Sequence, residues 1–207
     1  MVDHVVPAGG TDLRAAALYA ALTEFERLAA LAPLAPGLAD RLAVAHAVDG
    51  RYRRLRGALD RLGIAGESPP DAAAAVEGPA AAVDDARRRT ATADWWEGLV
   101  AADLCGVMSD ELFGALGDDA DKAEGEAEPV DARAAVPVLP IERIRAALAG
   151  DPVLAARLAL WGRRLAGESI VMARIFGAQR YPELADRLAL AHAARLAELG
   201  LGRAAAD

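Results

Sequence analysis

The sequence predicts an all-α fold, and its composition and its helix-breaking residues are the observations that predict it. The chain has 207 residues, of which 54% are hydrophobic and only 4% aromatic, so its core must consist mainly of alanine, leucine and valine. Alanine and leucine favour helices, whereas the residue types that favour strands are scarce. Prolines and glycines divide the chain into segments of helical length. The chain length suits one domain with a hydrophobic core.

The first half of the chain is predicted to hold a tail and three helices. Residues 1–10 form the tail, which precedes a single helical domain over residues 11–203. A first helix over 11–31 ends at a proline- and glycine-containing break, and a second helix follows over 38–62. An alanine-rich helix comes next, and we expect Gly78-Pro79 to kink or restart it because proline lacks the backbone donor.

The second half is predicted to hold four helices and one acidic loop. A helix begins at Asp94 and ends near Leu116. Seven acidic residues and one lysine lie between positions 117 and 131, without an apolar period, so we expect a mobile, solvated loop over 117–135. Further helices are expected over 141–150, 152–176 and 182–199, the second of them capped by the aspartate that precedes its proline. Short links between helices are typical of bundles.

A carboxylate interrupts the apolar stripe of the predicted 152–176 helix. Stripe residues recur at alternating steps of four and three, as on the core-facing side of a bundle helix. They are Leu154, Leu158, Trp161, Leu165, Glu168, Met172 and Ile175. A core carboxylate costs several kcal/mol unless it is paired, hydrogen-bonded, metal-bound or protonated. Glu168 therefore needs a partner.

Two other helices carry similar polar residues on their stripes. On the second helix the stripe is Leu38, Leu42, Ala45, Asp49 and Tyr52; on the last helix it is Leu184, Leu188, His192, Leu196 and Leu199. If the three helices align, Asp49, Tyr52, Glu168 and His192 meet in the centre of the bundle. The alternative is that each is satisfied separately, the histidine by a backbone carbonyl and the acid by a neighbouring arginine.

Charge and cysteine content restrict the class of protein. The net charge of −8 argues against nucleic-acid binding by bulk electrostatics, which needs clustered positive charge. The local basic stretch is predicted to be the solvated outer face of a helix; it comprises Arg51, Arg53, Arg54, Arg56 and Arg61. The single cysteine, Cys105, excludes an internal disulfide and fits a reducing cytosol. Neither a signal peptide nor an apolar run of membrane-spanning length is evident, so we expect a cytoplasmic protein without membrane contact.

Several stretches of this chain resemble a known family. They are Leu158-Ala159-Leu160-Trp161-Gly162-Arg163-Arg164-Leu165-Ala166-Gly167-Glu168, Ala191-His192-Ala193-Ala194-Arg195-Leu196-Ala197-Glu198-Leu199-Gly200, Leu34-Ala35-Pro36-Gly37-Leu38-Ala39-Asp40-Arg41 and the helix start Asp94-Trp95. Together they resemble actinobacterial ferritin-like proteins of the tRNA-hydroxylase (MiaE-like) group. The resemblance implies a ferritin-like four-helix bundle with additional helices. It also implies relatives that are non-haem di-iron oxygenases, whose metals are held by carboxylates and two Glu-x-x-His pairs on the core helices.

The chain departs from the ligand pattern of that family. It contains no Glu-x-x-His, and Asp49 and Tyr52 stand where the first pair is expected. The first helix has Ala20-Ala21-Leu22 where a glutamate is expected. Glu24 and Glu26 are nearby, but Phe25 between them fits the core face better. The middle helix has Leu104-Cys105-Gly106 where a carboxylate is expected. Only Glu168 and His192 match family ligand positions, with Asp49 as a shortened substitute. These residues predict a degenerate di-iron site, with no cofactor expected and iron as the metal if one binds.

Three functions are compatible with a chain that keeps some of the family's metal-ligand positions and lacks the others. The favoured one is a non-catalytic scaffold that binds a protein partner, a second copy or a small ligand. The alternative is an active iron-dependent hydroxylase with unusual ligation, acting on a modified tRNA or a small molecule; tRNA enters by family resemblance alone. A third is a mononuclear metal site or a proton-relay cluster at Glu168, His192 and Asp49.

Overall fold

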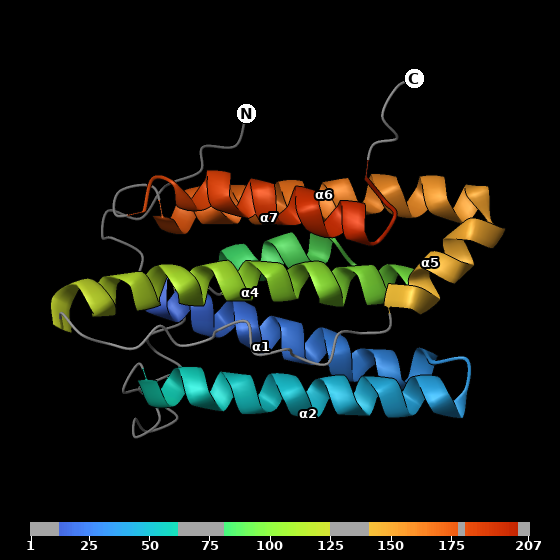
Figure 1. Ribbon diagram of the computed structural model, residues 1–207, viewed down its shortest axis with the longest axis horizontal. Helices are drawn as coiled ribbons and strands as arrows, with labels where there is room; N and C mark the ends of the chain where they lie inside the picture. The colour runs from blue at the N-terminus through green and yellow to red at the C-terminus, as the bar shows by residue number, and fades with distance from the viewer. Residues whose placement is uncertain (1–12, 62–80, 125–140, 178–180, 203–207) are drawn as a thin grey trace.

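The computed structural model describes residues 13–61, 81–124, 141–177 and 181–202, and these residues are almost entirely helical (Figure 1). The helices are α1 (Leu13–Leu31), the 3-10 turn η1 (Ala32–Leu34), α2 (Leu38–Arg61), α4 (Trp95–Glu124), α5 (Ile141–Gly150), α6 (Pro152–Gly177) and α7 (Leu184–Glu198). Residues 81–89 form a further helical segment. No strand occurs in the described part of the chain, which confirms the predicted all-α fold.

Four helices form the bundle. Helix α4 packs against α1, α6 and α7, while α6 packs along α7 and also touches α1. The remaining elements lie around these four: α2 packs on α1, and α5 packs on α6. Figure 1 shows this arrangement as layers, with α6 and α7 at the top, α4 and α1 in the middle and α2 at the bottom edge. Within the described residues, no helix combines the length and apolar character that crossing a bilayer requires.

Two apolar clusters fill the bundle, one toward each end. The first cluster includes Leu28 and Leu31 of α1, Leu99 and Leu104 of α4, Leu158 and Leu165 of α6, and Leu196 and Leu199 of α7. The second includes Leu13 and Ala20 of α1, Met108 and Leu112 of α4, Met172 and Phe176 of α6, and Leu184 and Leu188 of α7. The residues between them along each helix lie at mid-height of the bundle. They include Glu24, Gly106, Glu168 and His192, and we call this level the polar belt.

Caps fix the helix starts that the sequence predicted. The Asp151 carboxylate accepts hydrogen bonds from the backbone N–H groups of Val153 (3.0 Å) and Leu154 (2.9 Å), which would otherwise lack partners in the first turn of α6. Asp94 caps α4 in the same way by accepting from the Glu97 N–H at 2.9 Å. After α7, Gly200 adopts a left-handed φ of 79°, as is usual where glycine ends a helix.

The end of α4 differs from the prediction. The helix does not stop near Leu116 but continues to Glu124, so the first part of the segment expected to be a loop is helical. Two alanines, Lys122 and Glu124 favour helix in this stretch, whereas Gly117 and three aspartates disfavour it, so the sequence alone did not indicate this extension. The rest of the predicted acidic loop, the tail over 1–10 and the Gly78-Pro79 kink lie outside the described residues.

Candidate functional site

Helix α2 presents the opposite face to the bundle from the one predicted. The structure places Asp49 and Tyr52 on the exposed side, where Asp49 forms an ion pair with Arg53 and the Tyr52 ring packs 6.4 Å from that of Phe25. The face that packs inward instead carries Asp40, Val44, Ala47 and Arg51. The prediction that Asp49 and Tyr52 join Glu168 and His192 in the centre of the bundle is therefore wrong.

Arg51 from α2 and Glu24 from α1 form the best-buried ion pair of the belt. Arg51 Nε lies 2.6 Å from Glu24 Oε1, and only 4% of the Glu24 side chain is exposed. Arg51 Nη1 lies 3.6 Å from Asp110 Oδ1 of α4. Two predictions are corrected here: Arg51 is not on the solvated face of its helix, and Glu24 rather than the half-buried Phe25 faces the core.

Gly106 makes the space in which this ion pair sits. A Cβ atom at position 106 would lie 2.3 Å from Arg51 Nη2 and 2.8 Å from Glu24 Oε1, closer than non-bonded atoms approach. The guanidinium therefore lies directly against the α4 backbone. Gly106 belongs to the stretch Leu104-Cys105-Gly106, in which the family resemblance leads us to expect a carboxylate. In this chain the residue is a glycine, and the cation beside Glu24 is an arginine.

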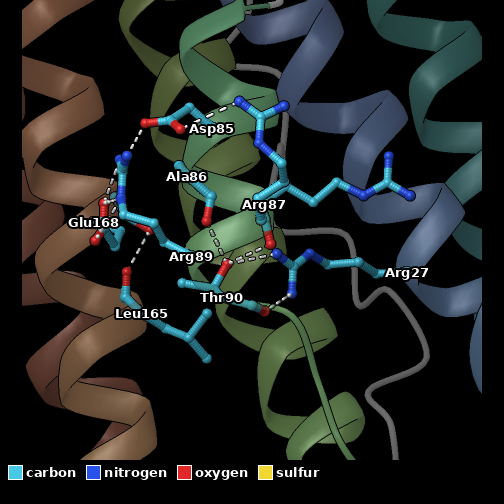
Figure 2. Close-up of polar contacts among 10 residues, drawn as sticks. Arg27, Asp85, Ala86, Arg87, Arg89, Thr90, Leu165 and Glu168 are labelled. Atoms are coloured by element: carbon cyan, nitrogen blue, oxygen red, sulfur yellow. Dashed lines mark hydrogen bonds and ion pairs between the residues drawn. The ribbon is translucent and has the colours of Figure 1, made fainter.

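Glu168 lies at the edge of the bundle and also has an arginine partner (Figure 2). Arg89, from the 81–89 segment, donates from Nε to both Glu168 oxygens at 3.1 Å and from Nη2 to Oε2 at 2.8 Å. Arg89 also forms an ion pair with Asp85. The simpler of the two interpretations, a core-stripe acid paired with an arginine, thus describes Glu168. The rest of the predicted α6 stripe is buried or half-buried except Ile175, which is exposed.

We expect Glu168→Leu to lower the free energy of unfolding by about 1 kcal/mol or less, since the carboxylate is partly exposed and Arg89 keeps Asp85 as a partner. Urea denaturation measures the change. Glu26→Leu is the matched control, because Glu26 forms a more exposed ion pair with Arg87. A loss of several kcal/mol at position 168 alone would contradict this account and indicate a carboxylate bound to something stronger than Arg89.

His192 is buried as predicted, but no residue of the described structure forms a hydrogen bond with its ring. Only 1% of the residue is exposed, and within the described residues neither Nδ1 nor Nε2 makes a hydrogen bond. Burial lowers the pKa of the imidazole from 6.5 to about 4, because desolvation disfavours the charged ring. The side chain is therefore neutral at physiological pH. The expected backbone carbonyl partner is not found in the described part of the chain.

Most other buried or half-buried carboxylates also pair with arginine. The pairs are Asp40–Arg143 (2.7 Å), Glu97–Arg157 (3.0 Å), Asp103–Arg195 (2.5 Å) and Glu111–Arg187 (3.0 Å). No group of three or more His, Cys, Asp or Glu side chains that could hold a metal ion occurs among the described residues. The residues of the belt therefore do not fit a di-iron centre, which needs several unpaired carboxylates and imidazoles around each ion.

A groove lies beside the belt, between α1, the start of α4 and the segment that follows residue 81. It has a volume of about 450 Å³, within the range of small-ligand sites. Leu31, Leu34 and Ala101 form part of its apolar surface. At its edge, Arg27 donates from Nη2 to Thr90 Oγ1 at 2.7 Å and from Nη1 to the Thr90 carbonyl at 3.2 Å (Figure 2). Sequence patterns alone did not indicate this groove.

The fold and the belt define an all-helical, ferritin-like bundle whose buried acids are paired with arginines. The chain matches the family described as the ferritin-like domain of actinomycetes over residues 6–192, and it belongs to that family. This match confirms the predicted ferritin-like fold at the level of the domain family, without assigning the chain to the tRNA-hydroxylase group. No curated protein matches the chain.

Proposed function

We propose that this protein is a non-catalytic member of the ferritin-like family, in which fixed ion pairs have replaced the metal centre and which works by binding another molecule. The observation that carries the proposal is the Arg51 guanidinium, which lies 2.6 Å from Glu24 in the space that Gly106 leaves open. An arginine in this place supplies the positive charge that a metal ion would otherwise supply. It cannot exchange ligands or bind dioxygen.

The distribution of charge through the belt supports the same conclusion. A di-iron centre needs carboxylates that are free to bind metal, whereas Glu24 and Glu168 of the belt, and Asp103 next to it, each have an arginine within 3 Å. Opposite charges at that distance hold a carboxylate in place and compete with a metal for its lone pairs. The groove of about 450 Å³ beside α1 offers a place for a small ligand that the belt does not offer.

The test is metal content after expression with added iron and purification without chelators. We expect wild-type protein to carry far less than one metal ion per chain by inductively coupled plasma mass spectrometry. Arg51→Glu removes the guanidinium and places a third carboxylate beside Glu24 and Asp110. We expect this variant to bind about one divalent cation per chain, since oxygen ligands gathered at one point favour such ions.

Arg53→Glu is the matched control, because it makes the same charge change two residues away on the exposed face of α2. It should bind no more metal than the wild type. About two irons in the wild-type protein would overturn the proposal and favour the iron-dependent hydroxylase acting on modified tRNA or a small molecule. About one metal, lost in His192→Leu, would instead favour a mononuclear site.

A further inference from the structure

Helix α2 exposes a stripe of mostly apolar residues, interrupted by the ion-paired Asp49 and ending at Tyr52, whose ring also packs against Phe25 of α1. Leu38 is 72% exposed, Leu42 62% and Tyr52 48%, and Ala45 and Asp49 between them are also exposed. These five residues recur at alternating steps of four and three, the spacing of a helix seam that packs against another helix. Figure 1 shows α2 at the outer edge of the molecule, with α1 on its inner side. We call this set of residues the α2 stripe.

The α2 stripe is one of two exposed apolar faces on the described helices. On α6, Val153, Leu160, Val171 and Ile175 also lie on one face, whereas Leu190 is a separate residue on α7, and single apolar residues of that kind are normal on protein surfaces. On α2, three large side chains share one face of one helix. A seam of this kind, bordered by charged residues, is typical of a surface that another helix covers.

The order of residues along the stripe makes it complementary to itself. Leu38 and Tyr52 are each seven residues from Ala45, and Arg41 and Asp49 are each four residues from it. If a two-fold axis passes Ala45, a second α2 runs antiparallel to the first. Leu38 then meets Tyr52 of the second copy, and Arg41 meets Asp49 of the second copy, each contact occurring twice.

The charges of Arg41 and Asp49 and the small size of Ala45 support this antiparallel pairing. Arg41 is exposed and forms no ion pair within the described residues, whereas Asp49 keeps one exposed partner, Arg53. An arginine opposite an aspartate is favourable, and like charges there would oppose association. Ala45, the smallest residue of the stripe, lies where the helix axes approach most closely.

We propose that this protein forms a two-fold homodimer in which the α2 stripes of two copies pack antiparallel about Ala45. The proposal goes beyond the binding function above and does not depend on the metal content of the belt. Residues of the stripe do not belong to the Glu24–Arg51 site, so variants of the stripe leave that site intact.

Molar mass, measured by light scattering after size exclusion and by sedimentation velocity over a range of concentrations, tests the proposal. We expect a dimer for the wild type. Leu42→Glu should weaken the dimer by about tenfold or more, because it places a charge in the centre of the seam. Leu160→Glu on α6 is the control for an equally exposed leucine and should leave the dimer unchanged.

Charge reversal tests the antiparallel register. Arg41→Asp alone and Asp49→Arg alone should each weaken the dimer, and the double variant should restore it, because the double exchange recreates both cross-copy pairs. Ala45→Cys should form a disulfide-linked dimer under mild oxidation, while the wild type, with Cys105 alone, should not.

Three results would overturn the proposal. The first is a monomer at all concentrations, as when other residues of the same chain cover the stripe. The second is a dimer that Leu42→Glu leaves unchanged or that Leu160→Glu disrupts as strongly. The third is charge reversal without rescue together with no Ala45→Cys cross-link.

Discussion

Arg51→Leu should lower the free energy of unfolding by about 3 kcal/mol, more than any single change on the outer face of the same helix. The variant keeps Glu24 buried but removes the guanidinium that lies 2.6 Å from its carboxylate. Removing one partner of a buried ion pair costs several kcal/mol, and Asp110 loses a favourable charge as well. The Arg51 side chain is slightly exposed, so we place the loss at the lower end of the range measured for broken buried pairs.

Equilibrium denaturation in guanidinium chloride measures this loss, and two further variants identify its cause. Arg53→Leu, two residues away and exposed, should change stability by about 0.5 kcal/mol or less. Adding Glu24→Leu to Arg51→Leu should recover most of the stability, because an apolar pair of similar volume often replaces a buried ion pair without cost. A loss below about 1 kcal/mol for Arg51→Leu would mean that the pair contributes no more than a surface ion pair.

The helices were predictable because their ends are marked by local chemistry. Asp94 and Asp151 cap α4 and α6, and their hydrogen bonds to the first-turn N–H groups form whatever the rest of the chain does. The buried side of α7 was also predictable, since Leu184, Leu188, Leu196 and Leu199 recur on one face and all four are buried, whereas Leu190 lies off that face and is exposed. The end of α4 was missed because Gly117 and three aspartates, which disfavour helix, follow Leu116, and yet the helix continues to Glu124.

The face of α2 was not predictable from the same periodicity, because this helix has apolar residues on two faces. Leu38 and Leu42 are larger than Val44 and Ala47, yet the structure buries the smaller pair and exposes the larger one. Small residues allow α2 to lie close to α1, and the long Arg51 side chain then reaches Glu24. Choosing the inward face of α2 by the size of its apolar side chains therefore gave the wrong stripe. Asp49 and Tyr52 lie on that stripe, so they were wrongly predicted to point inward.

Arg51 itself could not be recognised in a run of arginines, four of which lie within six residues. Its partner did leave a signal in the sequence. Leu13, Ala17, Ala20, Glu24 and Leu31 follow helical spacing on α1, and all of them are buried. Phe25 was predicted to face the core because it is more hydrophobic than Glu24. The spacing of the buried residues along α1 indicates Glu24 instead. An acid on an apolar stripe indicates that a cation lies nearby, but only the fold shows which one.

Lowering the pH from 7.5 to 5 should destabilise the protein by about 2 kcal/mol through His192 alone. The pKa of the buried imidazole is lowered from 6.5 to about 4, so the unfolded chain takes up a proton in this range and the folded protein does not. Stability is therefore greatest above pH 6.5 and falls as the pH drops toward 4. His192→Leu should remove this dependence and leave the stability at pH 7.5 unchanged or higher, since both ring nitrogens lack hydrogen-bond partners in the described structure.

Urea denaturation at a series of pH values between 7.5 and 5 measures the effect, and His46→Leu is the control because His46 is exposed on α2. The His46 variant should show the same pH dependence as the wild type. If His192→Leu also kept that dependence, the imidazole would not be its source. An imidazole titrating near 6.5 in the folded protein by NMR would show that water or a ligand reaches the ring. The polar belt would then be open at His192 although arginines occupy its carboxylates.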